Sequence, residues 1–212
     1  MNSAALQDPP EPVATRRELR AHLRQRRRDL SVALHRQWDR RILARLVRLP
    51  AWRAARTLAL YLPSDGEVDP RALILLADRL GKTIVLPRLH RQKPFHMDFV
   101  AYRPGLALQR NRFGIPEPCD PVVRAPIGID LVILPLVGFD PHGNRLGMGS
   151  GYYDRRFAFT RRRTGLRPKL IGLAYGFQRV PALDAQPWDV PLHGVVTERG
   201  WRRARPCVED SP

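Results

Sequence analysis

The sequence predicts an α/β fold, a three-layer sandwich around a mainly parallel central sheet, with two helices at the N-terminus. The first observation is that two amphipathic helix patterns precede any strand pattern. The second is that a strand, a helix and a strand follow one another between residues 57 and 87, an order that implies a parallel pair joined by a crossover. Further short apolar runs follow without an internal repeat, so we expect one principal sheet.

The two N-terminal helices are predicted from their starts and their apolar faces. Thr15 and Glu18 have the spacing of a capping box, in which each side chain binds a backbone amide of the first turn. A second helix is expected to begin at Ser31 and to end near Pro50. Its apolar face consists of Leu34, Trp38, Ile42, Leu46 and Leu49.

The rest of the chain alternates between strand and helix patterns. Short runs of β-branched and aliphatic residues predict strands at 57–63, 82–87, 96–102, 130–137, 169–176 and 195–198. Helices are predicted at 70–80, where Gly81 is the stop, and at 152–163.

The length of 212 residues suits one domain, which we place at 15–200. Residues 1–14 are rich in proline and are predicted to be a disordered lead-in, while 201–212 form a polar tail. The longest apolar run, 131–139, is about half of the roughly 18 residues that a membrane span requires. Because no secretory signal opens the chain, we expect a cytoplasmic protein without a membrane partner. We also expect a monomer.

The charge is unusual, because 37 Lys and Arg residues against 20 Asp and Glu residues give a net charge of +17. Polyanions are therefore candidate partners. However, only Lys82, Lys93 and Lys169 are lysines, and an excess of arginine is also what a GC-rich genome produces. No RNA-recognition signature accompanies the charge, so nucleic acid remains an alternative partner that we do not expect.

Chemistry-bearing residues gather in one stretch, GFDPHGNRLGMGSGYYDR at 138–155, between the most apolar strand and a helix. Ligands of parallel α/β sheets bind at the carboxyl ends of strands, which is where this stretch lies. Its four glycines, Gly143, Gly147, Gly149 and Gly151, allow backbone amides to approach an anion. Arg145 can clamp phosphate oxygens. The stretch fits neither a Walker A motif, nor a dinucleotide fingerprint, nor a nucleophile elbow.

Within that stretch, the string GNRLGMGSGYYDR resembles the signature loop of the 5-formyltetrahydrofolate cyclo-ligase family, also called methenyltetrahydrofolate synthetases. Other blocks agree in order and spacing: RRELR at 16–20, YLPSDGEVD at 61–69, TIVLPR at 83–88, the pair at 96–97, GIPEP at 114–118, IDLVILP at 129–135, Gln178 and DVPLHGVVTE at 189–198. The similarity therefore spans about residues 16–198.

The resemblance implies an ATP- and Mg²⁺-dependent conversion of 5-formyltetrahydrofolate to 5,10-methenyltetrahydrofolate, releasing ADP and phosphate. It also implies a fold similar to the ribose-5-phosphate isomerase and CoA-transferase group. Arg145 and Tyr152 are the implied catalytic residues, and Asp154 and Asp189 the implied metal ligands.

By the same resemblance, the residues that bind ATP are Arg16, Arg17, Arg20, Gly143, Arg145, Leu146, Gly147, Met148, Gly149, Ser150, Gly151, Tyr152 and Tyr153. Those that bind the folate are Leu62, Glu67, Met148, Gly149, Ser150, Gly151 and Tyr152.

Other interpretations of these residues stay open at this point. The arginines at 16 and 20 suit the solvated face of a helix, Glu67 suits an exposed loop, and Asp154 suits the first turn of a helix. The chain also has Arg16, Met148 and Ser150 where the family commonly has other residues. The two alternative functions are an RNA-binding relative on the same fold and an enzyme for another acyl or phosphorylated substrate.

Overall fold

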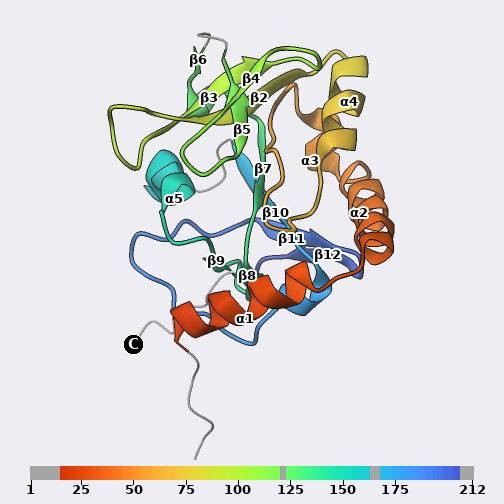
Figure 1. The fold of residues 1–212 in the computed structure, drawn as a ribbon, viewed down its shortest axis with the longest axis vertical. Helices are drawn as coiled ribbons and strands as arrows, with labels where there is room; N and C mark the ends of the chain where they lie inside the picture. The colour runs from red at the N-terminus through yellow and green to blue at the C-terminus, as the bar shows by residue number, and fades with distance from the viewer. Residues whose placement is uncertain (1–14, 120–122, 163–167, 206–212) are drawn as a thin grey trace, which may run out of the picture.

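The computed structural model describes residues 15–119, 123–162 and 168–205. A central mixed sheet has the strand order β12-β11-β10-β7-β1-β2-β3-β6 (Figure 1). Its five inner strands, from β11 to β2, are parallel, while β12, β3 and β6 are antiparallel to their neighbours. The α/β class and the mostly parallel sheet are therefore confirmed.

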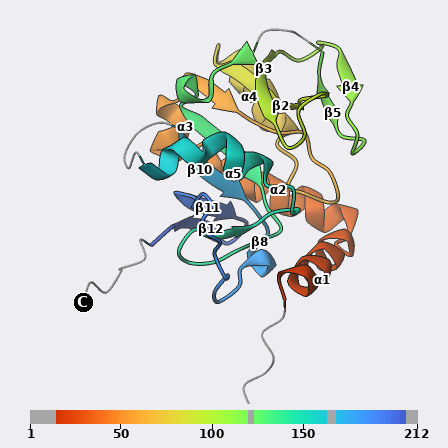
Figure 2. The same ribbon diagram turned by 90° about the vertical axis from the view of Figure 1, so that its left-hand side faces the viewer.

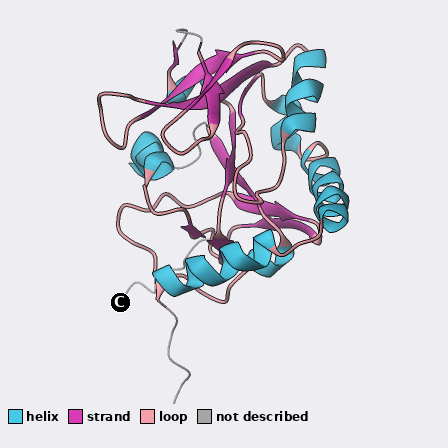
Figure 3. Cartoon of the chain, viewed as in Figure 1, coloured by secondary structure: helices cyan, strands magenta, loops and turns pink. Residues whose placement is uncertain are grey.

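The sheet strands are β1 (Thr57–Ala59), β2 (Thr83–Leu89), β3 (Met97–Tyr102), β6 (Val123–Arg124), β7 (Leu131–Pro135), β10 (Lys169–Leu173), β11 (Gly194–Thr197) and β12 (Gly200–Arg203). Two hairpins lie outside this sheet: β4 (Leu108–Arg110) with β5 (Pro116–Pro118), and β8 (Gly138–Phe139) with β9 (Arg145–Leu146). The helices are α1 (Arg16–Arg28), α2 (Val32–Leu46), α3 (Pro50–Ala54), α4 (Arg71–Arg79) and α5 (Tyr152–Phe157). Figure 3 colours these elements by type.

The helices cover both faces of the sheet (Figures 1 and 2). Helices α2, α3 and α4 pack on one face, where buried side chains such as Ile42, Trp52 and Leu73 join those of the strands. On the other face, Phe157 of α5 is buried with Phe99 and Val132. Helix α1 lies apart from both faces and packs near the β8–β9 hairpin. No helix among the described residues is long and apolar enough to span a membrane.

The predicted helix starts are present. The Thr15–Glu18 capping box opens α1, and the Ser31 hydroxyl accepts a hydrogen bond from the Leu34 amide at the start of α2. The second predicted helix is divided, because α2 ends at Leu46 and α3 begins separately at Pro50. A proline has no amide donor and a fixed φ, so it starts a new helix more readily than it continues an old one. From residue 15 onwards, three helices rather than two precede the first strand.

Several predicted boundaries differ from the structure. The strand predicted at 57–63 ends at Ala59, and the helix predicted at 152–163 is α5 followed by a 3₁₀ turn, Ala158–Arg162. The polar tail was expected to begin at 201, yet β12 continues to Arg203. This edge strand is held by backbone pairing with β11 while its side chains are exposed, so it lacks an apolar pattern. The lead-in at 1–14 and residues 206–212 lie outside the described residues.

Candidate active site

The signature loop is held in place by a buried carboxylate that the sequence analysis did not single out. Asp140 is 3% exposed and lies in the turn between β8 and β9. Its Oδ1 accepts from the amides of His142 and Asn144, at 2.9 and 3.0 Å. Its Oδ2 accepts from the Leu183 amide at 3.1 Å. Asp140 therefore fixes the hairpin that leads to Arg145, and it ties the hairpin to the segment before Asp189.

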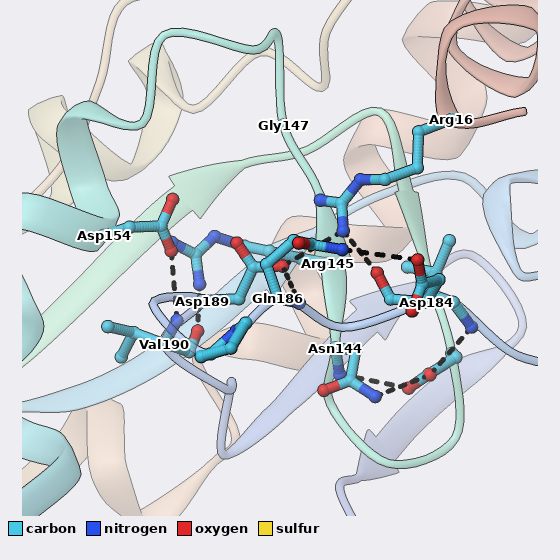
Figure 4. Close-up of polar contacts among 12 residues, drawn as sticks. Arg16, Asn144, Arg145, Gly147, Asp154, Asp184, Gln186, Asp189 and Val190 are labelled. Atoms are coloured by element: carbon cyan, nitrogen blue, oxygen red, sulfur yellow. Dashed lines mark hydrogen bonds and ion pairs between the residues drawn. The ribbon is translucent and has the colours of Figure 1, made fainter.

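Arg145 is buried and paired with Asp154 (Figure 4). Its Nη2 lies 2.5 Å from the Oδ1 of Asp154, and its Nη1 donates to the carbonyl oxygen of Val190. The amide of Val190 donates to the same Asp154 oxygen, at 3.0 Å. Asp154 is in the first turn of α5, as its simpler interpretation expected, but its carboxylate also joins the loop to the segment around Asp189.

Helix α1 brings two more of the predicted arginines to this place, Arg16 (Figure 4) and Arg20. The Nη1 of Arg16 lies 3.1 Å from the Oδ2 of Asp189, which also accepts from the Gln186 amide at 3.0 Å. The Nε of Arg20 donates to the carbonyl oxygen of Gly147 at 2.8 Å. Burial and the charge of Arg16 lower the pKa of Arg20, against the opposing effect of Asp189. Cations held this close favour a bound anion.

The glycines of the loop have different surroundings. A Cβ at Gly147 or Gly149 would meet nothing within 4 Å, so their backbones face open space. Gly151 has a φ of +65° and is the N-cap of α5. By contrast, Gly143 packs against Leu192, and its amide donates to Asp140 within the hairpin. Gly143 thus has a packing role, and its contact with ATP stays a prediction.

The other loop residues divide between core and surface. Leu146 is fully buried, whereas Met148 is 49% exposed and Arg17 is on the exposed side of α1. The carbonyl oxygen of Ser150 accepts from the Nη1 of Arg155 at 2.6 Å, which closes the end of the loop.

The two tyrosines that follow the loop differ. The hydroxyl of Tyr152 accepts from Arg112, and its ring meets the exposed Phe113 edge-on, with centroids 6.4 Å apart. This half-exposed aromatic surface suits a flat ring system. Tyr153 stacks on Phe157 with its ring 18° from parallel. Burial and the charge of Glu67 raise the pKa of Tyr153.

Glu67 is in the turn after β1, at the carboxyl end of that strand. Its Oε2 accepts from the amide of Ser64 at 3.0 Å, and burial raises the pKa of its carboxyl group. The simpler interpretation of Glu67 as an exposed loop acid is therefore wrong. Leu62 is half-buried and packs against the core cluster under α2 and α4.

A cluster of arginines around Asp65 was missed by sequence reasoning. Arg24, Arg27 and Arg28 of α1 pair with its carboxylate at 2.7, 2.7 and 3.1 Å. The run of arginines at the end of α1 has the pattern of a solvated helix face, yet Arg27 is only 1% exposed. No local pattern distinguishes Arg27 from its neighbours, since its burial depends on the turn at Asp65.

Asp65 makes the stability of the protein depend on pH. Burial tends to raise the pKa of Asp65, but hydrogen bonds from Arg24, Arg28 and Arg27 lower it from 3.8 to about 2. A folded-state pKa below the unfolded one stabilises the protein above about pH 4, and the contribution disappears as the pH falls towards 2. Asp65→Asn should therefore lower the free energy of unfolding at pH 7 and have a much smaller effect at pH 2.5. Urea titrations at both pH values measure this, and an equal loss at both would contradict it.

No three His, Cys, Asp or Glu side chains are grouped as metal ligands among residues 15–119, 123–162 and 168–205. Asp154 and Asp189 are connected instead through neighbouring contacts, because Val190 binds Asp154 and directly follows Asp189. Mg²⁺ is commonly held by one or two carboxylates together with water and substrate phosphates. The oxygen ligands of Asp154 and Asp189 are of the type that Mg²⁺ prefers, although each carboxylate is paired with an arginine, Asp154 with Arg145 and Asp189 with Arg16.

Comparison with known proteins agrees with this arrangement. The sequence pattern of the 5-formyltetrahydrofolate cyclo-ligase family matches residues 12–198. A 5-formyltetrahydrofolate cyclo-ligase of Haemophilus influenzae is 34% identical over 183 residues, which are 85% of this chain and 96% of that protein. One from Escherichia coli is 37% identical over 177 residues, covering 82% of this chain and 96% of the relative.

Solved structures give the same result. The 5,10-methenyltetrahydrofolate synthetase of Aquifex aeolicus aligns with a TM-score of 0.77 at 30% identity, covering 94% of this chain and 97% of that one. That of Mycoplasma pneumoniae aligns with a TM-score of 0.68 at 29% identity, covering 87% and 99%. From its loop, its fold and these relatives, the chain belongs to the 5-formyltetrahydrofolate cyclo-ligase family.

Proposed function

We propose that this chain converts 5-formyltetrahydrofolate to 5,10-methenyltetrahydrofolate, using ATP and releasing ADP and phosphate. The observation that carries the proposal is that three arginines lie together at the signature loop: Arg145 pairs with Asp154, Arg16 pairs with Asp189, and Arg20 donates to the carbonyl oxygen of Gly147. The family to which the chain belongs is named for this reaction. Nothing in the names of its relatives favours the RNA-binding alternative or another acyl substrate.

The reaction needs activation by phosphate, because the formyl oxygen is a poor leaving group. In the proposed sequence, that oxygen attacks the γ-phosphorus of ATP and the bond to ADP breaks. The carbon then carries an imidate phosphate. The N10 amine forms a bond to this carbon, loses its proton, and phosphate leaves. ATP supplies the activation, so no protein nucleophile is required.

The arginines supply the positive charge that phosphoryl transfer requires. Such transfer depends mainly on positioning and on neutralising the charge of the phosphate oxygens. Arg145 is fixed by Asp154 and Arg16 by Asp189, so both cations are oriented before ATP binds. The amides of residues 147–151 add donors beside the start of α5. Arg17 is a further proposed ATP contact at the exposed side of α1.

We place the folate between Glu67 and the loop. The half-exposed ring of Tyr152 and the exposed Met148 offer apolar surface for the pterin. Leu62, half-buried after β1, is a further proposed folate contact. The Glu67 carboxylate suits the polar edge of a pterin, because a carboxylate accepts hydrogen bonds from adjacent N–H groups. Tyr152 then touches both substrates where phosphate is transferred.

Asp154 and Asp189 would hold Mg²⁺ with phosphate oxygens of ATP. When bound, the ion would neutralise part of the phosphate charge. Asp154 and Asp189 also bind Arg145 and Arg16, so these carboxylates orient the cations whether or not the ion is present.

Three further properties remain proposals. A fold relationship to the ribose-5-phosphate isomerase and CoA-transferase group is supported by the parallel inner strands and the helices on both faces. We also propose that the protein acts in the cytoplasm and as a monomer.

The decisive experiment follows the absorbance of the methenyl product in a mixture of the protein and 5-formyltetrahydrofolate. We expect the absorbance to grow only when ATP and Mg²⁺ are both present, with one ADP released per product. Growth without ATP, or ADP release without the chromophore, would contradict the proposal. Salt-sensitive binding of RNA by an inactive sample would favour the alternative instead.

A further inference from the structure

We propose that Arg27 is a positioning residue of the folate site, which holds the turn 63–66 from α1 and thereby orients Glu67 towards the substrate. This inference rests on the proposed function and adds a residue to it. Arg27 does not itself touch the proposed substrates, and it lies outside the signature loop.

The guanidinium of Arg27 joins three parts of the chain. Its Nε donates to the carbonyl oxygen of Asp65 at 2.7 Å, and its Nη2 donates to the Asp65 carboxylate at 2.7 Å. Its Nη1 donates to the carbonyl oxygen of Leu136 at 3.3 Å, just before the β8–β9 hairpin. The planar fork of arginine donors fits such a set of acceptors, whereas a lysine can occupy only one direction well.

The turn that Arg27 holds has an unfavourable backbone. Asp65 has a φ of +48° and Gly66 a φ of +71°. A residue with a Cβ rarely adopts a left-handed conformation unless its surroundings impose it. Helix and turn also approach closely, because a Cβ at Gly66 would lie 3.3 Å from the carbonyl oxygen of Arg27. The hydrogen bonds from Arg27 therefore offset the energetic cost of the left-handed backbone at Asp65.

The orientation of Glu67 follows from this turn. The Glu67 amide donates to the Ser64 carbonyl at 3.0 Å, and the Glu67 carboxylate accepts from the Ser64 amide at 3.0 Å. Both bonds span the residues that Arg27 holds. If the turn relaxes, the carboxylate must move with it.

Arg27 also acts on the charge of Glu67. The groups that interact electrostatically with this carboxylate are Arg27 from α1, Asp65 from its own turn, Tyr61 after β1 and Tyr153 from α5. Burial raises the pKa of Glu67, and the charge of Arg27 is the main effect that lowers it. Arg27 thus helps to keep Glu67 ionised where it would bind the folate.

A network from the core fixes the backbone of Arg27. Its carbonyl oxygen lies 3.1 Å from the Nε2 of His35 in α2, whose Nδ1 lies 2.7 Å from the hydroxyl of Tyr175. That hydroxyl donates to the Oδ1 of Asp39 at 2.9 Å. The end of α1 is therefore anchored to α2 and to the chain after β10, which allows Arg27 to act as a fixed support.

The test is the steady-state kinetics of Arg27→Gln in the full chain. We expect KM for 5-formyltetrahydrofolate to rise about tenfold, with kcat and KM for ATP within about twofold of wild type, because binding lost equally in the ground and transition states changes KM. Arg26→Gln is the matched control. It removes the same charge from the preceding residue, whose exposed side chain lies over the Phe177 ring and does not bind the turn 63–66. Arg27→Lys should recover only part of the loss.

A pH profile separates positioning from a general effect on folding. The acid limb of kcat/KM for the folate should move to higher pH in Arg27→Gln, because the pKa of Glu67 rises when the cation is removed. NMR titration of the Glu67 carboxyl carbon reports the same shift without substrate. If Arg27→Gln does not fold, Asp65→Asn is measured in its place, and its KM for the folate should also rise.

The outcomes distinguish this inference from the proposed function. Wild-type protein without turnover overturns the function, while the NMR titration still tests whether Arg27 acts on Glu67. If the wild type is active, a folded Arg27→Gln variant with unchanged folate KM and unchanged acid limb overturns the role of Arg27 alone. A folded Asp65→Asn variant with unchanged folate KM does the same.

Discussion

Arg145→Ala is expected to lower kcat for methenyl formation by about 10²- to 10³-fold, with a smaller change in either KM. Arg145 is 7% exposed, and its guanidinium is fixed by Asp154 and by the carbonyl oxygen of Val190. A cation fixed in advance needs no reorganisation when charge develops on the transferred phosphoryl group, so its largest contribution is to the transition state. The measurement is the initial rate of methenyl absorbance at saturating ATP and folate.

The same substitution leaves the Asp154 carboxylate without its cation, so stability must be separated from catalysis. Thermal unfolding of Arg145→Ala and of the double variant Arg145→Ala/Asp154→Asn makes this separation, because the double variant removes the unpaired charge. Arg79→Ala, an exposed arginine of α4, is the matched control and should keep wild-type kinetics. A folded Arg145→Ala variant with kcat within about threefold of wild type would contradict the proposed role of Arg145.

Features with a local cause were predictable from the sequence. The Thr15–Glu18 box and Ser31 each satisfy amides within their own helix, and both were found where the pattern predicts them. Apolar runs likewise located the strands of the inner sheet. Strand β12 was missed because its stability comes from backbone bonds to β11, which its exposed side chains do not reveal.

The same distinction between local and long-range causes applies to the site. Its glycine loop and the chemistry of Arg145 were visible as a sequence pattern, whereas the partners of the site residues depend on the fold. Asp154 and Asp189 are 35 residues apart and are connected through Val190, whose amide binds Asp154 and whose carbonyl oxygen accepts from Arg145. Asp140 and Arg27 were not predicted, since aspartates in turns and arginines in helices are usually exposed. Their burial is set by contacts with Leu183 and Asp65.

Gly143→Ala should lower the free energy of unfolding by about 3 kcal/mol. Two costs add to this value: the steric overlap of the new methyl group with its neighbours, and the left-handed backbone conformation, which is unfavourable for alanine. Gly143 has a φ of +86°, and a Cβ there would lie 2.5 Å from the carbonyl oxygen of Leu192 and 2.7 Å from the Cβ of Ala204. The carbonyl cannot easily withdraw, because the Leu192 amide donates to the Gly143 carbonyl at 2.9 Å. Urea unfolding measures the loss.

Gly147→Ala is the matched control, because it adds the same methyl group to the same loop where nothing lies within 4 Å. Its unfolding free energy should stay within about 0.5 kcal/mol of wild type. The added methyl group points into the space proposed for phosphate, so KM for ATP should rise about tenfold. The pair separates two roles that the sequence pattern combines. A Gly143→Ala variant that is as stable as wild type would contradict the packing role. If its KM for ATP were also raised as expected for Gly147→Ala, Gly143 would be an ATP-binding residue.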